Sequence, residues 1–183
     1  MRVIAGTARG VPLRAPRDRS TRPITDRVKE TLFAILGDRV PDARVLDLYA
    51  GSGAIGIEAL SRGAARCVFV ERDRGALRAL NDNLDALDLD DRAKVVAADV
   101  MSVVGTVDAD IVFADPPYDF DAWHDLLGRV TADLVVAESG STVAAPSGWT
   151  VTRDKKYGRT RVTFLERTSD PSAGDAAVGS VTQ

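Results

Sequence analysis

Short apolar runs alternate with amphipathic segments through the middle of the chain. The apolar runs predict strands at residues 44–49, 66–71, 94–98, 109–114 and 134–137. Apolar residues at helical spacing predict helices at 54–62, 74–87 and 121–130. This alternation is typical of a parallel sheet with crossover helices, and the runs at 149–152 and 161–165 predict a closing antiparallel hairpin. The predicted fold class is therefore α/β, with a mostly parallel sheet of seven strands.

The N-terminal part of the chain has a different pattern. Two short apolar runs, 2–6 and 11–13, flank a glycine-containing turn and predict a small β-hairpin. An arginine-rich linker follows, and then Thr25 is a plausible N-cap for an amphipathic helix that ends at Gly37. We therefore divide the chain into a basic extension (1–23), a main domain (24–167) and a tail (168–183), which is expected to be disordered because it is small and polar.

Composition excludes several classes of protein. A chain of 183 residues suits one domain with a real core. The single cysteine, Cys67, lies in an apolar run, which rules out a disulfide framework or a cysteine metal cluster. No apolar run approaches the roughly 18 residues of a membrane span. We expect a soluble, cytoplasmic protein that needs no metal and does not enter a membrane.

Positive and negative charges are concentrated in different regions of the chain. The net charge is −3, yet residues 1–29 carry a net +6 and residues 153–167 a net +4, while residues 30–152 carry −11. Local clusters of Lys and Arg, and not net charge, make contacts with phosphates. The two basic segments can therefore form a surface for a polyanion, although a solvated arm and an ordinary charged hairpin would show the same pattern.

A glycine-rich loop follows the first strand of the main domain. Gly51, Gly53 and Gly56 satisfy the pattern G-x-G-x-x-G, and Glu71 ends the next strand 20 residues after Gly51. The glycines let backbone approach a ligand closely, and an acid at this position can accept both hydroxyl hydrogens of a ribose. NAD and S-adenosylmethionine both contain such a ribose, so the loop alone favours neither, and a tight structural turn is a third interpretation.

Two further acids bear on the choice of cofactor. Asp47 lies in the apolar strand that precedes the loop, where it would repel a pyrophosphate but suit the cationic ammonium and sulfonium groups of S-adenosylmethionine. Asp99 follows the third strand of the alternating pattern, where it can accept from an adenine amine or cap a helix. The sequence favours S-adenosylmethionine and leaves both interpretations of Asp99 open.

The motif Asp115-Pro116-Pro117-Tyr118 follows a fully apolar strand. This is the end at which open α/β sheets bind ligands, and consecutive prolines make the turn stiff. If Asp115 and the Pro116 carbonyl accept the two hydrogens of a base amine, the nitrogen can aim its lone pair at a methyl group. Tyr118 can stack on the base. We predict Asp115, Pro116, Pro117 and Tyr118 as the catalytic residues, although a rigid loop would also use such prolines.

Four segments carry a resemblance to a known family. They are Arg2–Gly6 with Arg9–Gly10, Arg22–Phe33, Asp47–Gly63 and Asp115–Tyr118. With them, the chain resembles the bacterial small-subunit rRNA guanine-N2 methyltransferases of the RsmD family, within the class I methyltransferases, over residues 2 to about 167. The Arg22–Phe33 segment is the most discriminating, because the others occur across many methyltransferases.

The resemblance implies a Rossmann-like enzyme that methylates the N2 amine of a guanine in 16S rRNA, within a 30S subunit or an assembly intermediate. Its cofactor would be S-adenosylmethionine, which leaves as S-adenosylhomocysteine. The predicted cofactor residues are Asp47, Tyr49, Ala50, Gly51, Ser52, Gly53, Glu71, Arg72, Asp99, Val100 and Asp115. The predicted RNA-binding residues are Arg9, Arg22, Arg27, Lys155, Lys156 and Arg159.

Three other functions remain open at this point. A DNA adenine-N6 methyltransferase uses the same Asp-Pro-Pro-Tyr chemistry, but sequence-specific members usually add a recognition domain for which this chain has no room. An NAD-linked oxidoreductase explains the glycine loop but not Asp47 or the Asp-Pro-Pro-Tyr motif. A non-catalytic RNA-binding module explains only the basic segments. We expect a monomer, since no heptad pattern or exposed apolar stripe indicates a dimer.

Overall fold

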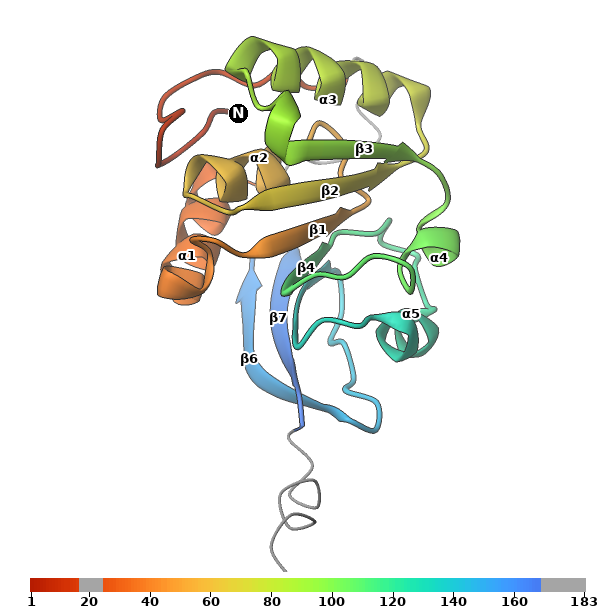
Figure 1. The fold of residues 1–183 in the computed structure, drawn as a ribbon. Coiled ribbons are helices and arrows are strands. Elements are labelled where there is room, and N and C mark those ends of the chain that lie inside the picture. Colours follow the sequence, from red (N-terminus) through yellow and green to blue (C-terminus); the bar gives the residue numbers. More distant parts are fainter. Residues whose placement is uncertain (17–24, 169–183) are drawn as a thin grey trace, which may run out of the picture.

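A computed structural model describes residues 1–16 and 25–168 (Figure 1). Its seven-stranded sheet has the order β3-β2-β1-β4-β5-β7-β6. The strands are β1 (Arg44–Leu48), β2 (Arg66–Glu71), β3 (Ala93–Ala97), β4 (Ile111–Ala114), β5 (Leu134–Ser139), β6 (Trp149–Tyr157) and β7 (Thr160–Arg167). β1 to β5 are parallel, and β7 runs antiparallel to both β5 and β6. The predicted mostly parallel sheet with a closing hairpin is confirmed.

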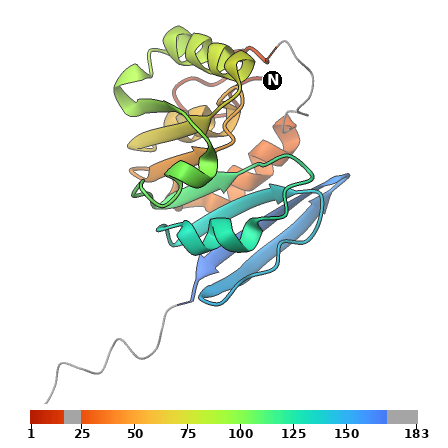
Figure 2. The same ribbon diagram turned by 90° about the vertical axis from the view of Figure 1, so that its right-hand side faces the viewer.

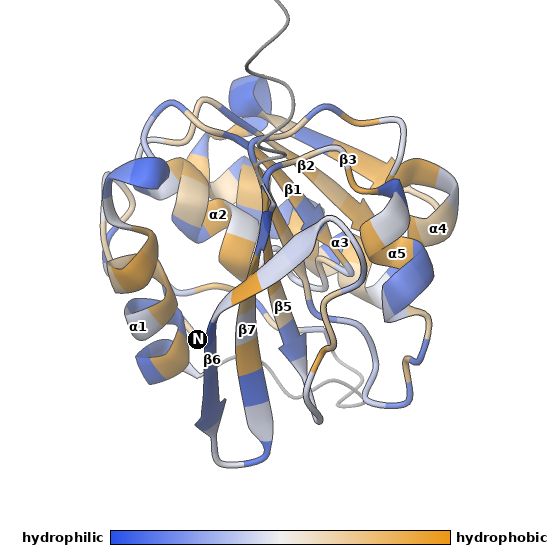
Figure 3. Cartoon of the chain, turned by 90° about the horizontal axis from the view of Figure 1, so that it is seen from below, coloured by the Kyte–Doolittle hydropathy of each residue, from blue (hydrophilic) through white to orange (hydrophobic). Residues whose placement is uncertain are grey.

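Helices cover both faces of the sheet (Figures 2 and 3). They are α1 (Asp26–Leu36), α2 (Ala54–Ser61), α3 (Arg74–Leu87), α4 (Val100–Val103) and α5 (Trp123–Arg129), with 3-10 turns at Gly37–Arg39 and Asp90–Arg92. Apolar side chains of α1, α2 and α3 pack with one face of the sheet, and those of α4 and α5 pack with the other. None of the helices in the described part of the chain is long and apolar enough to cross a membrane.

The main differences from the sequence prediction lie in short elements. The four-residue helix α4 was not predicted from periodicity, because a single turn leaves no periodic pattern, and only the helix-cap interpretation of Asp99 pointed to it. Both strands of the closing hairpin are longer than predicted. The N-terminal hairpin has one isolated bridge, between Arg2 and Pro12, and not two regular strands. The predicted linker and tail lie almost entirely outside the described residues, which omit 17–24 and 169–183.

Local signals explain where the long helices begin and how they pack. The Thr25 hydroxyl accepts from Val28 N–H at 3.3 Å, and the Asp73 carboxylate accepts from Ala76 N–H at 2.8 Å, so both helices have side-chain N-caps. The central helix α2 is buried along its whole length. A Cβ on Gly56 would lie 2.3 Å from Phe69 Cε1, so glycine is what allows α2 to pack directly on β2.

A buried ion pair holds the N-terminal hairpin against α1 and α2. Lys29 Nζ lies 3.1 Å from Glu58 Oε2, both side chains are fully buried, and the ammonium also donates to the Arg2 carbonyl at 2.6 Å. Glu58 accepts from Ile4 N–H at 2.8 Å, from Ala5 N–H at 3.0 Å and from Arg62 Nε at 2.8 Å. Each buried charge therefore has several partners, as a stable buried pair requires.

Candidate active site

The predicted site residues gather at one edge of the sheet. β1 is flanked by β2 and β4, so the chain order reverses between β1 and β4. Ligands of open α/β sheets bind at the carboxyl ends of the strands next to such a reversal. The glycine loop leaves β1 at this point, and the Asp115–Tyr118 turn leaves β4 directly beside it, with Asp115 N–H continuing the ladder to the Leu48 carbonyl.

The three loop glycines have different physical roles. Gly51 has φ +57° and faces open space, apart from the Tyr49 carbonyl 4.0 Å from a Cβ built on it. Gly53 has φ +80°, and a Cβ there would lie 2.4 Å from Leu80 Cδ1. Gly56 serves helix packing. Gly51 is therefore the position whose bare backbone is available to a ligand, because the other two are closed by the core.

Glu71 connects the end of β2 to the glycine loop. Its Oε2 accepts from Gly51 N–H at 2.8 Å, and its Oε1 accepts from the backbone N–H groups of Arg72 and Asp73, both at 2.8 Å. A carboxylate has about four acceptor positions, so these bonds leave one free. Glu71 thus fixes the loop and still has capacity for a ribose hydroxyl.

Asp47 is buried under the glycine loop. Its Oδ2 accepts from Gly56 N–H at 2.9 Å, in the first turn of α2, where Gly53 has no side chain to serve as a cap. Burial raises the pKa of Asp47 to about 7, and hydrogen bonding to Gly56 opposes the shift. The sequence assigned Asp47 only to the cofactor. The structure adds a role as a cap of α2 and shows a carboxylate whose ionisation a nearby cation would favour.

Asp99, Val100 and Arg72, which are expected beside adenine, lie together at the start of α4. Asp99 is the N-cap of α4 and accepts from Met101 N–H at 2.9 Å, so the helix-cap interpretation is confirmed. Its other oxygen accepts from Arg72 Nη1 at 2.8 Å. Val100, the first residue of α4, is buried. A contact between Asp99 and adenine stays a prediction.

Tyr49 has an unusual backbone conformation at the end of β1. Its φ is +60°, a left-handed conformation that costs a non-glycine residue about 1–3 kcal/mol. The ring packs edge-on against Phe120, at 5.8 Å between centroids, and Phe120 packs in the same way on Trp123 at 5.2 Å. Burial raises the pKa of Tyr49 to about 12, with Asp99 adding to the shift. The aromatic contacts join the β1 loop to the segment after the Asp115–Tyr118 turn.

Asp115 lies at the centre of the site and is mostly buried. Burial raises its pKa well above the ordinary value, and the neighbouring charges of Glu138 and Asp47 raise it further. Pro116 is buried, Pro117 is exposed, and the Phe120 N–H donates to the Pro117 carbonyl at 2.9 Å, which closes a tight turn. A turn follows the two prolines as predicted, and its stiffness stays a prediction.

Glu138 was not predicted as a site residue. Ala114 pairs with Ala137 in register, so the next rung places Asp115 beside Glu138. Glu138 is 8% exposed, and its Oε2 has no hydrogen-bond partner among the described residues. Burial raises its pKa to about 7, which hydrogen bonding from the Thr160 hydroxyl opposes. The sequence did carry a signal that could have identified Glu138. Like Glu71, it is an acid at the end of an apolar run.

Tyr118 lies over the end of β5 and is 60% exposed. A Cβ built on Gly140 would lie 3.0 Å from Tyr118 Cδ1, so the ring rests directly on this glycine. The Tyr118 hydroxyl lies 3.4 Å from Thr160 Oγ1. An exposed ring held at this edge is available to stack on a planar base.

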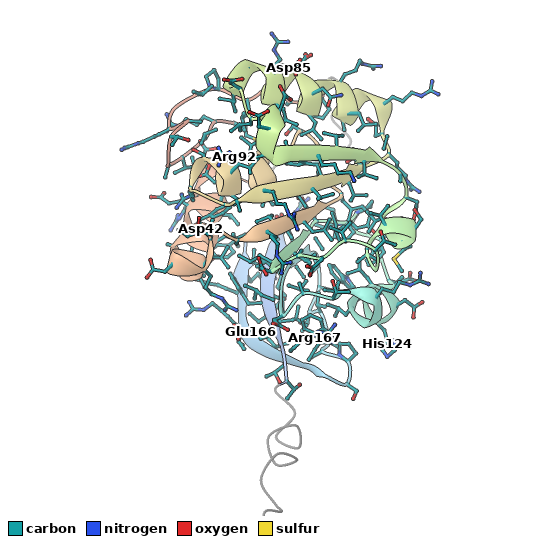
Figure 4. All side chains as sticks on the ribbon, viewed as in Figure 1. Asp42, Asp85, Arg92, His124, Glu166 and Arg167 are labelled. Carbon is teal, nitrogen blue, oxygen red and sulfur yellow. The ribbon has the colours of Figure 1, made fainter. Side chains whose placement is uncertain are left out.

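The structure divides the predicted RNA-binding residues between two edges. Lys155, Lys156 and Arg159 are exposed on the β6–β7 hairpin, whose turn adjoins the end of β5 and therefore the site. Arg27 is exposed in the first turn of α1. Arg9 is exposed in a turn bound to Ser61 at the end of α2, which is the opposite edge, where Asp42 and Arg92 also lie (Figure 4). Arg22 lies outside the described residues.

Comparisons with known proteins agree with this geometry. A family model described as conserved hypothetical protein 95 matches residues 1–166. The chain belongs to this family. Family relatives include the ribosomal RNA small subunit methyltransferase D of Escherichia coli K12, 36% identical over 91% of this chain and 90% of that protein. Another is the putative rRNA methyltransferase YlbH of Bacillus subtilis, 36% identical over 91% of this chain and 99% of that protein.

Solved structures extend the family likeness to the fold. A putative methyltransferase of Escherichia coli, yhhF, superposes with a TM-score of 0.82 at 35% identity, over 93% of this chain and 99% of that one. A putative methylase of Haemophilus influenzae superposes with a TM-score of 0.75 at 30% identity, over 92% and 99%. The fold is therefore that of the class I methyltransferases, as the sequence predicted.

Proposed function

We propose that this protein is an S-adenosylmethionine-dependent methyltransferase that modifies the exocyclic N2 amine of a guanine in 16S rRNA. The observation that carries the proposal is the position of Asp115, on a rigid turn directly beside the glycine loop and among buried carboxylates. The family relatives named as rRNA methyltransferases support the substrate class.

The residues present fit S-adenosylmethionine. Gly51 leaves open space at the loop, Glu71 has a free acceptor position for a ribose hydroxyl, and Asp47 is a buried acid whose ionised form a cation would favour. When bound, S-adenosylmethionine supplies a methyl group that is already activated for transfer. The protein then has to bind, orient and desolvate the two reactants.

Asp115 and the Pro116 carbonyl would hold the target amine. The lone pair of a base amine is delocalised into the ring, so the nitrogen is a poor nucleophile until its two hydrogens are held out of plane. Asp115 can accept one hydrogen and the Pro116 carbonyl the other, while the two prolines keep both acceptors fixed. The exposed Tyr118 ring would stack on the base, a contact worth about 1–3 kcal/mol in single-stranded nucleic acid.

The basic residues of the β6–β7 hairpin, and Arg27 on α1, would bind the RNA backbone. Lys155, Lys156 and Arg159 lie at the end of the β6–β7 hairpin where β7 pairs with the end of β5, and Arg27 lies in the first turn of α1. The target base has to leave its stack to reach Asp115, at a cost of a few kcal/mol that a loop nucleotide minimises. Arg9 lies at the far edge, so any RNA contact of Arg9 would be to a more distant part of the substrate.

The test is methyl transfer from labelled S-adenosylmethionine to 30S particles and to naked 16S rRNA that lack the modification, followed by nucleoside analysis. N2-methylguanosine is the expected product. Label in N6-methyladenine of DNA would instead support an adenine methyltransferase. Binding of NAD without binding of S-adenosylmethionine would support an oxidoreductase, and RNA binding indifferent to both cofactors would support a binding module.

Two substitutions separate the proposed roles of the buried acids. Asp115→Ala should reduce turnover by about 100-fold or more and leave cofactor binding nearly intact, because it removes an acceptor for the amine. Asp47→Ala should instead weaken cofactor binding. Asp121→Ala is the matched control, since Asp121 is exposed in the loop just after the turn. Wild-type turnover in Asp115→Ala would reject the catalytic role.

A further inference from the structure

Glu138 is a buried carboxylate with one oxygen left without a partner. Its Oε2 accepts no hydrogen bond from any described residue, although the residue is only 8% exposed. Buried polar atoms without a partner are rare, because each costs the full free energy of its lost hydration. Neither the fold nor the holding of the target amine uses this oxygen. It is therefore placed to receive a donor that the described part of the chain does not supply.

The position of Glu138 limits what that donor can belong to. The register of β4 and β5 places Glu138 beside Asp115 on adjacent strands, which lie about 4.8 Å apart. The Tyr118 ring rests on Gly140, two residues further along the same chain segment. A base stacked on Tyr118, with its amine at Asp115, would bring the neighbouring atom of its ring edge to Glu138.

Guanine carries the donor that this arrangement lacks. Its N1–H lies next to the N2 amine on the same ring edge, so guanine offers three hydrogens to acceptors. Adenine has an unprotonated N1 beside its amine, which would face the Glu138 carboxylate with a lone pair and repel it.

We propose that Glu138 accepts the N1–H of the target guanine and thereby selects guanine over bases that have an acceptor at N1. The inference rests on the proposed methylation of guanine N2 and adds the residue that determines base specificity. Asp115 and the Pro116 carbonyl hold the amine that reacts, and Glu138 contacts the adjacent N1 position of the ring. A site that hydrogen-bonds a substrate N–H strongly rejects analogues that lack this N–H, because the buried acceptor of the protein then stays unpaired.

Two base analogues test the proposal without any mutation. 2,6-Diaminopurine and 2-aminopurine both keep the 2-amine but have an acceptor at N1, and they differ from each other at position 6. Each is placed at the modified position of 16S rRNA by ligation of synthetic segments, in whichever assembly state supports N2-methylguanosine formation. At pH 8.5, above the pKa of about 7 of Glu138, where its carboxyl is ionised and can only accept, wild-type protein should methylate guanine about 100-fold or more faster than either analogue, measured as kcat/KM. Equal rates for guanine and both analogues would overturn the proposal.

The variant Glu138→Gln provides a second, independent measurement. Its amide has nearly the same shape, but its NH₂ group can donate to the N1 acceptor of either analogue. The preference for guanine should fall to about 10-fold or less, partly because the rate with 2,6-diaminopurine rises. A purely structural role for Glu138 would lower all rates together and leave the ratio unchanged, which would also overturn the proposal.

Controls separate this inference from the proposed function. Glu166→Gln changes a half-exposed acid, paired with Arg39, at the opposite end of the β5–β7 pairing and should leave the ratio unaltered. S-adenosylhomocysteine binding to each variant checks that the cofactor site is intact. If wild-type protein forms no N2-methylguanosine from guanine, the proposed function fails. If it does so but accepts the analogues equally well, only the role of Glu138 fails.

Discussion

Two groups of buried carboxylates in this protein have opposite surroundings. Glu58 is fully buried and accepts from Lys29, Arg62 and two backbone N–H groups. Asp47, Asp115 and Glu138 are also largely buried, but they form no ion pair among the described residues, and burial raises the pKa of each. The first group stabilises the fold, because its charges have their partners within the chain. Asp47 has one backbone hydrogen bond, to Gly56, but no described cation lies against any of the three, so a ligand that supplies donors or positive charge would stabilise their ionised forms.

The largest expected effect comes from breaking the paired group. Glu58→Gln should lower the free energy of unfolding by about 3–5 kcal/mol, because it leaves the Lys29 ammonium buried without its counter-charge. Urea denaturation at pH 7.5 measures the change. Glu30→Gln on the exposed surface of α1 is the control and should stay within about 0.5 kcal/mol of wild type.

The same chemical change in the second group should have the opposite sign. Glu138→Gln should raise the free energy of unfolding by about 1–3 kcal/mol at pH 8, since it removes a buried charge that has no cation. A loss of stability as large as that of Glu58→Gln would show that Glu138 is paired with a cation, and would contradict the proposed difference between the two groups of carboxylates.

The pH dependence of the stabilising effect follows from the sign of the shift. The pKa of Glu138 is raised from 4.5 to about 7, so its contribution to stability is fully present below pH 4.5 and is lost as the pH rises to about 7. The advantage of Glu138→Gln should therefore be small at pH 4.5 and nearly complete at pH 8. Denaturation curves of both proteins across this range measure it, and a pH-independent difference would speak against the assignment.

A smaller effect is expected on cofactor affinity. The pKa of Asp47 is raised to about 7, so the carboxylate becomes ionised mainly between pH 6 and 8. Over this range the affinity for S-adenosylmethionine, whose sulfonium is a cation, should rise several-fold, or about 1 kcal/mol in binding free energy. The affinity for S-adenosylhomocysteine, whose sulfur is uncharged, should change less. Calorimetric titration of both ligands tests this, with Asp47→Asn expected to remove the difference.

The smallest effect concerns Arg62, the less buried cation that contacts Glu58. Arg62 donates to Glu58 and lies over the Phe33 ring, with its guanidinium carbon 4.8 Å from the ring centroid. Arg62→Met should keep most of the packing and lower the free energy of unfolding by about 0.5–1.5 kcal/mol, because Lys29 still neutralises Glu58. A loss equal to that of Glu58→Gln would show that Arg62, and not Lys29, is the main partner.

Most of the fold could be predicted because buried parallel strands leave a direct signal. Strands such as β1 and β4 are covered on both faces and read as continuous apolar runs, and the helices between them keep their own spacing. The N-cap at Thr25 was equally readable. The single-turn helix α4 and the one-bridge N-terminal hairpin were not, because such short elements depend on contacts with the rest of the molecule, such as Ser61 with Ala8.

The candidate site was predicted in part for the same reason. Motifs that are continuous in sequence, the Gly51–Gly56 loop and the Asp115–Tyr118 turn, could be recognised and assigned to one edge of a sheet. Glu138 directly follows the predicted strand 134–137, but its place beside Asp115 depends on which strand pairs with β4 and in what register, and that could not be read from the sequence. The position of Arg9 at the edge opposite the site likewise depends on the direction of α2, whose last residue, Ser61, binds the Arg9 turn.

The sequence by itself determined the order of strands and long helices along the chain, the glycine loop, the turn after β4 and the family, because each depends on residues that are close together in the sequence. Only the tertiary structure decided which buried acids are paired. Lys29 and Glu58 are far apart in the chain and in contact in space, whereas Asp115 and Glu138 meet only through the register of β4 and β5. Electrostatic energy depends on distance through space and on burial, and neither can be read from separation along the chain.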